Sequence, residues 1–364
     1  MKRRDFLAGA AAVGAIGAAS AVSAPAIASG KRTLKMVTTW PKNFPGLGTG
    51  AARAAKRITD MSDGQLTVKL FAAGELVPAF ESFDAVSSGT ADLYHAAEYY
   101  WQGKHKAFNF FTSVPYGLTA GEMDAWIHHG GGQELWDELA SGFNIKPFAC
   151  GNTGVQMGGW FNKEINSVED LKGLKIRMPG LGGEVLRRLG AAAVTLPGGE
   201  IFPSLQSGAI DATEWVGPWN DLAFGFYKVT KYYYSPGFHE PGSTLSCGVN
   251  LDVWKSLTPA QQAIVQNATM AENNYMMAEF NARNGDSLEV LLKKHGVQER
   301  KFSDDVMMAI GDASGEVMRE VAKTDALTTK IFDSYTDFRR KAIKWSDRSE
   351  ASYWNARKLP FKYS

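Results

Sequence analysis

Two glutamates are the residues whose type and neighbours most favour chemistry in a cleft. Glu214 lies in Thr213-Glu214-Trp215 and Glu240 in Phe238-His239-Glu240, each beside aromatic residues at the end of a predicted strand. Two carboxylates close together repel unless a cation lies between them, and oxygen ligands of this kind suit Na⁺ or Ca²⁺. The same pair also suits acid–base hydrolysis, and two such acids are often unrelated surface groups. The local pattern leaves these alternatives open.

Arg177 is a candidate for binding an anion. It lies near the end of the predicted strand 174–178, where it alternates with apolar neighbours and cannot easily reach solvent on both faces. Its planar guanidinium suits a carboxylate, which it can hold by two hydrogen bonds. A buried arginine can equally pair with an Asp or Glu of its own chain, and the pattern does not separate the two interpretations.

The elements that would position these groups begin with alternating strands and helices. We predict strands over 33–40, 65–71 and 92–94, with helices over 51–61 and 78–88 between them. This order predicts a parallel α/β sheet whose ligand crevice lies at the carboxyl ends of its strands.

A short sequence pattern in the first half of the chain is repeated in the second half. Residues 74–79 are echoed by 199–204, and residues 88–92 by 207–211. In each copy a short helix that begins with Pro stops at Ser-Gly and leads through Asp into a strand. Two matches in the same order favour two related α/β lobes, whose facing strand ends would form a cleft.

The second half adds strands and long helices. We predict strands over 148–150, 155–161, 174–178, 192–196 and 212–216. A capping box at Thr258 and Gln261 opens a helix that reaches Lys294, Ser303 opens another, and a last helix covers 331–357. The last helix carries aromatic residues on more than one face, which indicates that one of these faces contacts a partner.

Residues 1–28 are predicted to be a twin-arginine export signal that is cleaved after Ala28. Arg3 and Arg4 precede an Ala- and Gly-rich stretch that ends in Ala26-Ile27-Ala28. Its removal lowers the formal net charge from +1 to about −1 and leaves a periplasmic protein. No apolar run long enough to span a membrane follows residue 30.

Composition and motifs exclude several classes of protein. With 39 Lys+Arg against 38 Asp+Glu, the chain is not a nucleic-acid binder that works through a basic face. It contains no C-x-x-C or H-E-x-x-H motif, and no G-x-G-x-x-G opens a helix after a strand. An exported enzyme that uses the paired glutamates stays as the alternative function. Cys150 and Cys247 are equally suited to a disulfide or to two buried free thiols.

Three segments together resemble the extracytoplasmic solute receptors of TRAP transporters, the tripartite ATP-independent periplasmic systems of the DctP type. They are residues 152–161, 171–177 and 210–218. The likeness runs from about Thr33 to the C-terminal helices and is closest to the branch that binds 2-oxo acids with a metal cation. It implies an α/β, two-lobed periplasmic binding protein fold with a hinged cleft and long C-terminal helices.

The resemblance also implies the residues that hold the organic anion. In that branch a glutamine and an arginine bind the anion, and these roles fall on Gln156 and Arg177. An aromatic cluster lines the pocket from the first lobe, which corresponds to Tyr99 and Tyr100.

The cation site is implied in the same way. A glutamate and the main-chain carbonyl of the next tryptophan hold the cation in that branch, which corresponds to Glu214 and Trp215, and Glu240 completes the site. The cation would be Na⁺ or Ca²⁺. Phe238-His239 departs from the paired tryptophans expected beside the second acid, and this leaves the identity of the solute open among 2-oxo acids such as pyruvate and related hydroxy acids.

The implied protein is a receptor and not an enzyme. It would close on a small carboxylate and deliver it to the TRAP membrane permease subunits. We expect residues 29–150 to form the first lobe, to which later segments return, and 151–250 to form the second. Residues 251–364 would be a helical region that spans the lobes and pairs two chains through its C-terminal helix.

Overall fold

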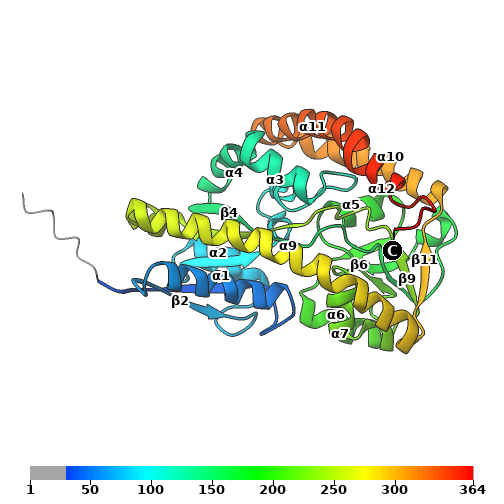
Figure 1. Cartoon of the computed structure of the whole chain (residues 1–364), viewed down its shortest axis with the longest axis horizontal. Helices are drawn as coiled ribbons and strands as arrows, with labels where there is room; N and C mark the ends of the chain where they lie inside the picture. The colour runs from blue at the N-terminus through cyan, green and yellow to red at the C-terminus, as the bar shows by residue number, and fades with distance from the viewer. Residues whose placement is uncertain (1–29, 364) are drawn as a thin grey trace, which may run out of the picture.

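The computed structural model describes residues 30–363, so the predicted export signal and its cleavage site after Ala28 lie outside the described part of the chain. The described residues form two mixed β-sheets that are covered by helices (Figure 1). No helix among them is both long enough and apolar enough to cross a membrane. This architecture confirms the predicted α/β class.

The first sheet has five strands in the order β2-β1-β3-β10-β4. β1 is parallel to β2 and β3, as the alternation of strands and helices predicts, whereas β10 is antiparallel to both of its neighbours. The strands are β1 (Arg32–Thr38), β2 (Leu66–Phe71), β3 (Leu93–Ala96), β4 (Ile145–Asn152) and β10 (Thr244–Asn250).

The second sheet has six strands in the order β11-β9-β5-β8-β6-β7. β6 is parallel to β7 and β8, and β5 is antiparallel to β8 and β9. The strands are β5 (Gly159–Phe161), β6 (Lys175–Arg177), β7 (Ala192–Val194), β8 (Ala212–Thr213), β9 (Tyr232–Ser235) and β11 (Gln298–Lys301). The strand predicted over 155–161 starts only at Gly159, because the preceding residues cross between the sheets.

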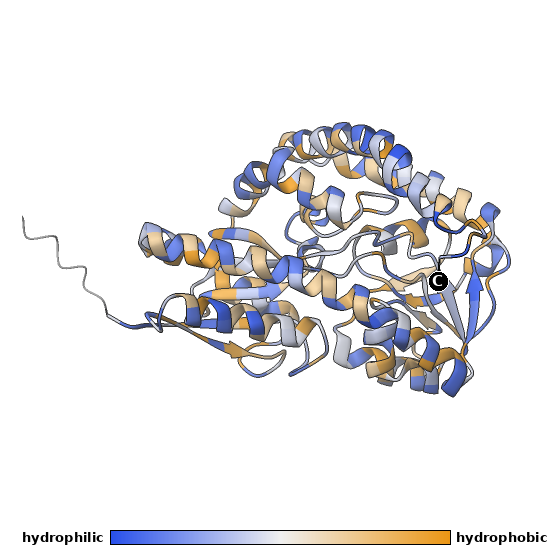
Figure 2. Ribbon diagram, in the orientation of Figure 1, coloured by the Kyte–Doolittle hydropathy of each residue, from blue (hydrophilic) through white to orange (hydrophobic). Residues whose placement is uncertain are grey.

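Helices surround both sheets, and hydrophobic and hydrophilic residues alternate along many of them, including α11 (Figure 2). They are α1 (Leu47–Met61), α2 (Ser82–Ser87), α3 (Ala120–His129), α4 (Gly132–Ser141), α5 (Gly180–Arg188), α6 (Gly198–Gln206), α7 (Pro218–Phe224), α8 (Leu251–Ser256), α9 (Pro259–His295), α10 (Asp304–Ala322), α11 (Ala326–Ser346) and α12 (Ser352–Ala356). The predicted capping box at Thr258 opens α9, and Ser303 caps α10. The last helical stretch begins at Ala326, earlier than predicted.

The two repeated segments share the way in which they enter a strand, although their helices start differently: Pro78 precedes a 3₁₀ turn, whereas Pro203 lies inside α6, which begins earlier than predicted. Asp92 accepts a hydrogen bond from the backbone N–H of Lys35 in β1 at 2.7 Å, and Asp211 accepts one from the backbone N–H of Lys175 in β6 at 3.1 Å. A glycine in the left-handed region ends the preceding helix in each copy. The Lys–Asp contact thus helps to position the strand that follows each repeated segment: β3 lies beside β1, and β8 lies beside β6.

Two extended segments, 153–158 and 236–243, cross between the sheets side by side. Thr153 donates its backbone N–H to the Ser243 carbonyl at 3.1 Å, and Gln156 donates its N–H to the Glu240 carbonyl at 3.1 Å. Two strands lie elsewhere than the expected boundaries place them. β10, inside the range expected for the second lobe, belongs to the first sheet, and β11, inside the expected helical range, is an edge strand of the second sheet.

Helix α9 is a third connection and runs along both sheets (Figure 1). In its first half the buried Glu272 carboxylate pairs with Arg53 and Arg57 of α1. In its second half Asn284 accepts a hydrogen bond from the backbone N–H of Trp219 in α7 at 3.1 Å. The same helix is thus fastened to both lobes.

The two cysteines lie in neighbouring strands. Cys150 in β4 and Cys247 in β10 are fully buried, and both are free thiols in the structure. Of the two alternatives that the sequence leaves open, the structure has the free thiols.

We predict that Gly248→Ala destabilises the fold. A Cβ atom at this position of β10 would overlap the ring of Tyr94, which is fully buried and donates its hydroxyl to Glu98 at 2.7 Å. Overpacking of this kind costs about 2 kcal/mol in the free energy of unfolding, which urea denaturation would measure. The control is Gly285→Ala in α9, where the added Cβ meets nothing within 4 Å and should stabilise by about 0.5 kcal/mol. Equal stability of the two variants would contradict the prediction.

Candidate functional site

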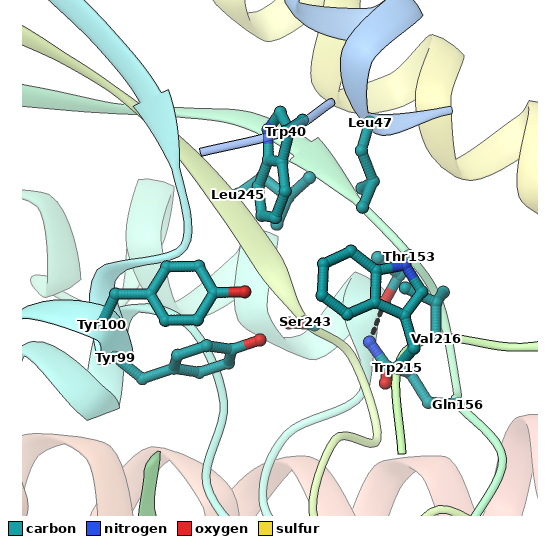
Figure 3. Close-up of a pocket in the computed structure, with 10 residues that line it drawn as sticks. All are labelled: Trp40, Leu47, Tyr99, Tyr100, Thr153, Gln156, Trp215, Val216, Ser243 and Leu245. Carbon is teal, nitrogen blue, oxygen red and sulfur yellow. Dashed lines mark hydrogen bonds between the residues drawn. The ribbon is translucent and has the colours of Figure 1, made fainter. Parts of the chain in front are cut away.

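A small cavity lies between the two sheets, at the carboxyl ends of their parallel strands (Figure 3). Its volume of about 10 Å³ leaves room for roughly one water molecule, so the cleft is closed. Its lining comes from both lobes and both crossing segments and consists of Trp40, Leu47, Tyr99, Tyr100, Thr153, Gln156, Trp215, Val216, Ser243 and Leu245. Tyr99, Tyr100, Gln156 and Trp215 are predicted site residues.

Arg177, the last residue of β6, is fully buried behind this lining. It forms an ion pair with the Glu214 carboxylate, and its Nη1 also donates to the Glu214 carbonyl at 3.2 Å. Its Nη2 reaches the Tyr100 hydroxyl of the first lobe at 3.4 Å, and Trp215 lies beneath the guanidinium at 5.0 Å. Of the two interpretations of Arg177, the structure has the ion pair within the chain. One edge of the guanidinium faces Tyr100 of the other lobe.

Both carboxylate oxygens of Glu214 have partners. Arg177 takes Oε1, and His239 Nε2 lies 3.1 Å from Oε2. Burial alone lowers the pKa of His239, but the Glu214 carboxylate raises it above its ordinary value. Within the described residues the second ring nitrogen of His239 has no hydrogen-bond partner. Glu214 is therefore a buried carboxylate held between two nitrogen donors.

Glu240 lies on the second crossing segment and is 3% exposed. Its Oε2 accepts a hydrogen bond from Gln156 Nε2 at 2.7 Å, and the same amide nitrogen donates to the Thr153 hydroxyl at 3.0 Å. Burial, and then the charge of Glu214, raise the pKa of Glu240 to about 7. Gln156 Oε1 is buried without a partner in the part of the chain that the structure describes. The site thus contains an acceptor without a partner, Gln156 Oε1, and a carboxyl group, that of Glu240, whose ionisation is unfavourable.

Tyr99 and Tyr100 project from a turn of 3₁₀ helix, η2 (Glu98–Trp101), that follows β3. Their rings meet edge to face at 4.8 Å, and their hydroxyls point into the cavity (Figure 3). Burial raises the pKa of Tyr100 to about 12, so its hydroxyl is a donor at neutral pH. The structure therefore brings both tyrosines to the site.

The acidic groups fit a cation that prefers oxygen. Ligand atoms of Glu214, Glu240 and His239 lie within 4.8 Å of one another, and all three residues are buried. No hydrogen bond to the Trp215 carbonyl is found among residues 30–363, so this oxygen is also available. Two carboxylates and a peptide carbonyl are ligands typical of Na⁺ or Ca²⁺ sites.

Sequence reasoning missed several residues of the site. His239 was noted only as a departure from the family pattern, although it contacts Glu214. Trp40 was given no role, although it follows a parallel strand, where ligand-binding residues gather. Thr153 and Ser243 lie on the crossing segments, which carry no strand or helix signal.

A family model describes most of the chain. The model of the bacterial extracellular solute-binding proteins, family 7 (DctP), matches residues 36–325. A monocarboxylate 2-oxoacid-binding periplasmic protein of Nostoc sp. is 44% identical over 321 residues, which cover 88% of each chain.

Two solved structures are similar over nearly their whole length. A TRAP solute-binding protein of Pseudoalteromonas atlantica with bound sodium and pyruvate is 40% identical, has a TM-score of 0.87 and covers 91% of this chain and 100% of its own. One from Bordetella bronchiseptica is a dimer with calcium and picolinate in one site and an apo second site. It is 37% identical, has a TM-score of 0.88 and covers 90% of this chain and 97% of its own.

We predict that Glu240 makes the ligand-free protein less stable as pH rises. Its pKa is raised from 4.5 to about 7 on folding, so its contribution to stability is complete below pH 4.5 and is lost as pH rises through about 7. Between pH 5 and pH 8 the melting temperature of Glu240→Gln, measured in chelator without Na⁺, should therefore fall less than that of the wild type. Glu200→Gln, at an exposed position, should keep the wild-type slope. Identical slopes for wild type and Glu240→Gln would refute this assignment.

Proposed function

The chain belongs to family 7 of the bacterial extracellular solute-binding proteins, the DctP family, and on this basis we propose that it captures a small 2-oxo acid, such as pyruvate, together with Na⁺ or Ca²⁺. It then delivers the solute to the membrane subunits of a TRAP transporter. The observation that carries this proposal is the buried group of one guanidinium and two carboxylates between the lobes.

The charges of this group explain why a receptor for an anion would need a cation. Arg177 contributes one positive charge, and Glu214 and Glu240 contribute two negative charges when both are ionised. In that state, with His239 neutral, a carboxylate entering the site meets net negative charge, which is unfavourable in a buried environment. A bound cation between the glutamates supplies the missing positive charge and binds oxygen atoms of the solute.

The ligands of the relatives support a chelating acid. Pyruvate and picolinate, bound in the two similar structures, each carry a second donor atom next to the carboxylate, a keto oxygen or a ring nitrogen. Both can therefore hold a cation through a five-membered chelate. A 2-hydroxy acid has the same arrangement and is the closest alternative solute.

The chain's own residues would divide the remaining work. Arg177 holds the carboxylate of the solute through the edge that now faces Tyr100, and Gln156 can donate an amide N–H to a solute oxygen in place of its bond to Thr153 or Glu240. The hydroxyls of Tyr99 and Tyr100 donate hydrogen bonds from the first lobe. The cation ligands are Glu214, Glu240 and the Trp215 carbonyl.

Closure of the lobes would complete the site. Gln156 and Glu240 lie on the two crossing segments, where a hinge between the sheets must bend. Opening would separate Tyr100 from Arg177 and admit the solute, and closing would exclude water and strengthen each polar contact. No covalent bond changes in this sequence. The family of solute receptors supports a protein without enzymatic activity over an exported enzyme that uses the paired glutamates.

The location and assembly of the protein are part of the proposal. The family and the predicted twin-arginine signal support export to the periplasm. A row of exposed apolar residues along the end of α11, α12 and the residues after it supports a homodimer, as does the dimeric relative from Bordetella bronchiseptica. These exposed residues are Ile343, Trp345, Tyr353, Trp354, Leu359, Phe361 and Tyr363.

We predict that Arg177→Ala abolishes pyruvate binding. Removing a buried, hydrogen-bonded charge of this kind costs about 3 kcal/mol or more, so the dissociation constant from calorimetric titration should rise at least about 100-fold. Arg177→Lys keeps the charge without the planar fork and should bind with intermediate affinity. Arg188→Ala, which removes a surface arginine paired with Glu316 and Glu320, is the control and should bind normally. Wild-type affinity in Arg177→Ala would overturn the proposed anion site.

Removal of the cation should weaken solute binding as well. We expect the protein to lose affinity for pyruvate after exchange into buffer with chelator and with choline in place of Na⁺ at constant ionic strength. Addition of Na⁺ or Ca²⁺ should restore binding, and the ion that restores it identifies the cation. Unchanged affinity in the cation-free buffer would rule out a cation-dependent site.

A further inference from the structure

Trp40 lines the cavity but has no role in the proposed binding of the carboxylate or the cation. It follows β1, is 2% exposed, and its ring points into the cavity from the first lobe (Figure 3). Its ring meets Trp215 edge to face at 6.1 Å and lies 6.1 Å from the ring of Tyr100. Trp40 therefore contacts lining residues of both lobes.

Two hydrogen bonds in series fix the Trp40 ring. Trp40 Nε1 donates to His95 Nδ1 at 2.7 Å, and His95 Nε2 lies 3.0 Å from the Cys150 carbonyl. Both bonds form together only in the neutral tautomer with its proton on Nε2, and burial lowers the pKa of His95 to about 4. The indole has a single N–H, which His95 accepts, so Trp40 presents only hydrocarbon to the cavity.

Trp40 belongs to an apolar wall that also contains Leu47 and Leu245. The three side chains lie on one side of the cavity, and Gln156 lies on the other (Figure 3). Glu240 lies on the side of Gln156, to which it bonds, and Arg177 is linked to that side through Glu214, whose ligand atom lies within 4.8 Å of one of Glu240. The cavity therefore has a polar end and an apolar end.

We propose that this apolar wall contacts the carbon chain of the solute and limits its length. The ring of Trp40, which is held in place, blocks longer chains. The inference rests on the proposed function, because it takes the carboxylate to be held at the polar end. The free volume of about 10 Å³ is too small even for pyruvate, so the lobes must part to admit any solute, and each added methylene then requires further displacement of the wall. The two hydrogen bonds resist displacement of Trp40, since moving the ring would leave a buried N–H without an acceptor.

The wall also selects against a second charge. Leu47 and Leu245 carry no polar side-chain group, and the single N–H of Trp40 is bonded to His95. A carboxylate at the far end of the solute would be buried against Trp40, Leu47 and Leu245 without a partner, which is strongly unfavourable. The preferred solutes are therefore short-chain monocarboxylic 2-oxo acids, and 2-oxoglutarate is excluded.

Calorimetric titration of a chain-length series tests the proposal. Pyruvate, 2-oxobutyrate, 2-oxohexanoate and 2-oxoglutarate would be titrated into the wild type, Trp40→Leu and Leu47→Ala at saturating cation. We expect the wild type to lose about tenfold in affinity for each methylene beyond pyruvate. Each variant should improve binding of 2-oxohexanoate relative to pyruvate by at least about tenfold, while 2-oxoglutarate binds weakly to all of them. A wild type without length dependence, or variants with the wild-type ratio, would overturn the proposal.

Controls separate this inference from folding effects and from the proposed function. Trp126→Leu removes another buried indole of the first lobe, whose Nε1 donates to Ser334, and should leave the length preference unchanged. A changed preference in Trp126→Leu would count against the wall. If the wild type binds no 2-oxo acid with either cation, the proposed function fails. If it binds pyruvate and the wall variants keep its length preference, only the wall fails.

Variants of His95 test its role as a positioning residue. His95→Leu removes the acceptor of the Trp40 N–H and should relax the length preference. His95→Asn can place its amide oxygen near the position of Nδ1 and should restore part of that preference. Equal chain-length preferences in the wild type and both variants would show that His95 does not position the Trp40 ring.

Discussion

One guanidinium and two carboxylates are buried together between the lobes, and the elements around them must supply partners for these polar groups. Arg177 can be buried because Glu214 accepts its charge, and Glu214 is held in turn by His239. Glu240 has no cationic partner of its own and relies on the Gln156 amide. Such a group is tolerable only where several elements converge to supply partners, and the facing strand ends of two sheets provide that convergence.

The connections between the lobes make this group sensitive to closure. The two crossing segments bond to each other through Gln156 and Glu240, so a hinge at these segments would move residues of the site. Helix α9 is fastened to α1 through Glu272 and to α7 through Asn284, and a packed helix bends less readily than extended chain. In the proposed closure, α9 would therefore be the stiffest of the three connections.

Local signals predicted much of the fold and part of the site. The caps of α9 and α10 and the strand ends at Arg177 and Glu214 depend on neighbouring residues, which a sequence displays directly. The insertion of β10 between β3 and β4 depends on pairing over about a hundred residues or more, which no local pattern records. The contact of His239 with Glu214 and that of Trp40 with His95 are likewise long-range. The positions of Gln156, Tyr99 and Tyr100 were indicated only by resemblance to a family.

The matching Lys–Asp contacts show how one scaffold can yield a cavity with two chemically different ends. Asp92 and Asp211 occupy the same place in their lobes, and three residues after each comes a buried side chain beside the cavity, His95 in one lobe and Glu214 in the other. The same backbone position thus carries a ring that orients an indole on one side and a carboxyl group that pairs with an arginine on the other. The two lobes share this frame but differ at this pair of positions, and the difference contributes to the polarity of the cavity and so to the direction in which a solute can lie.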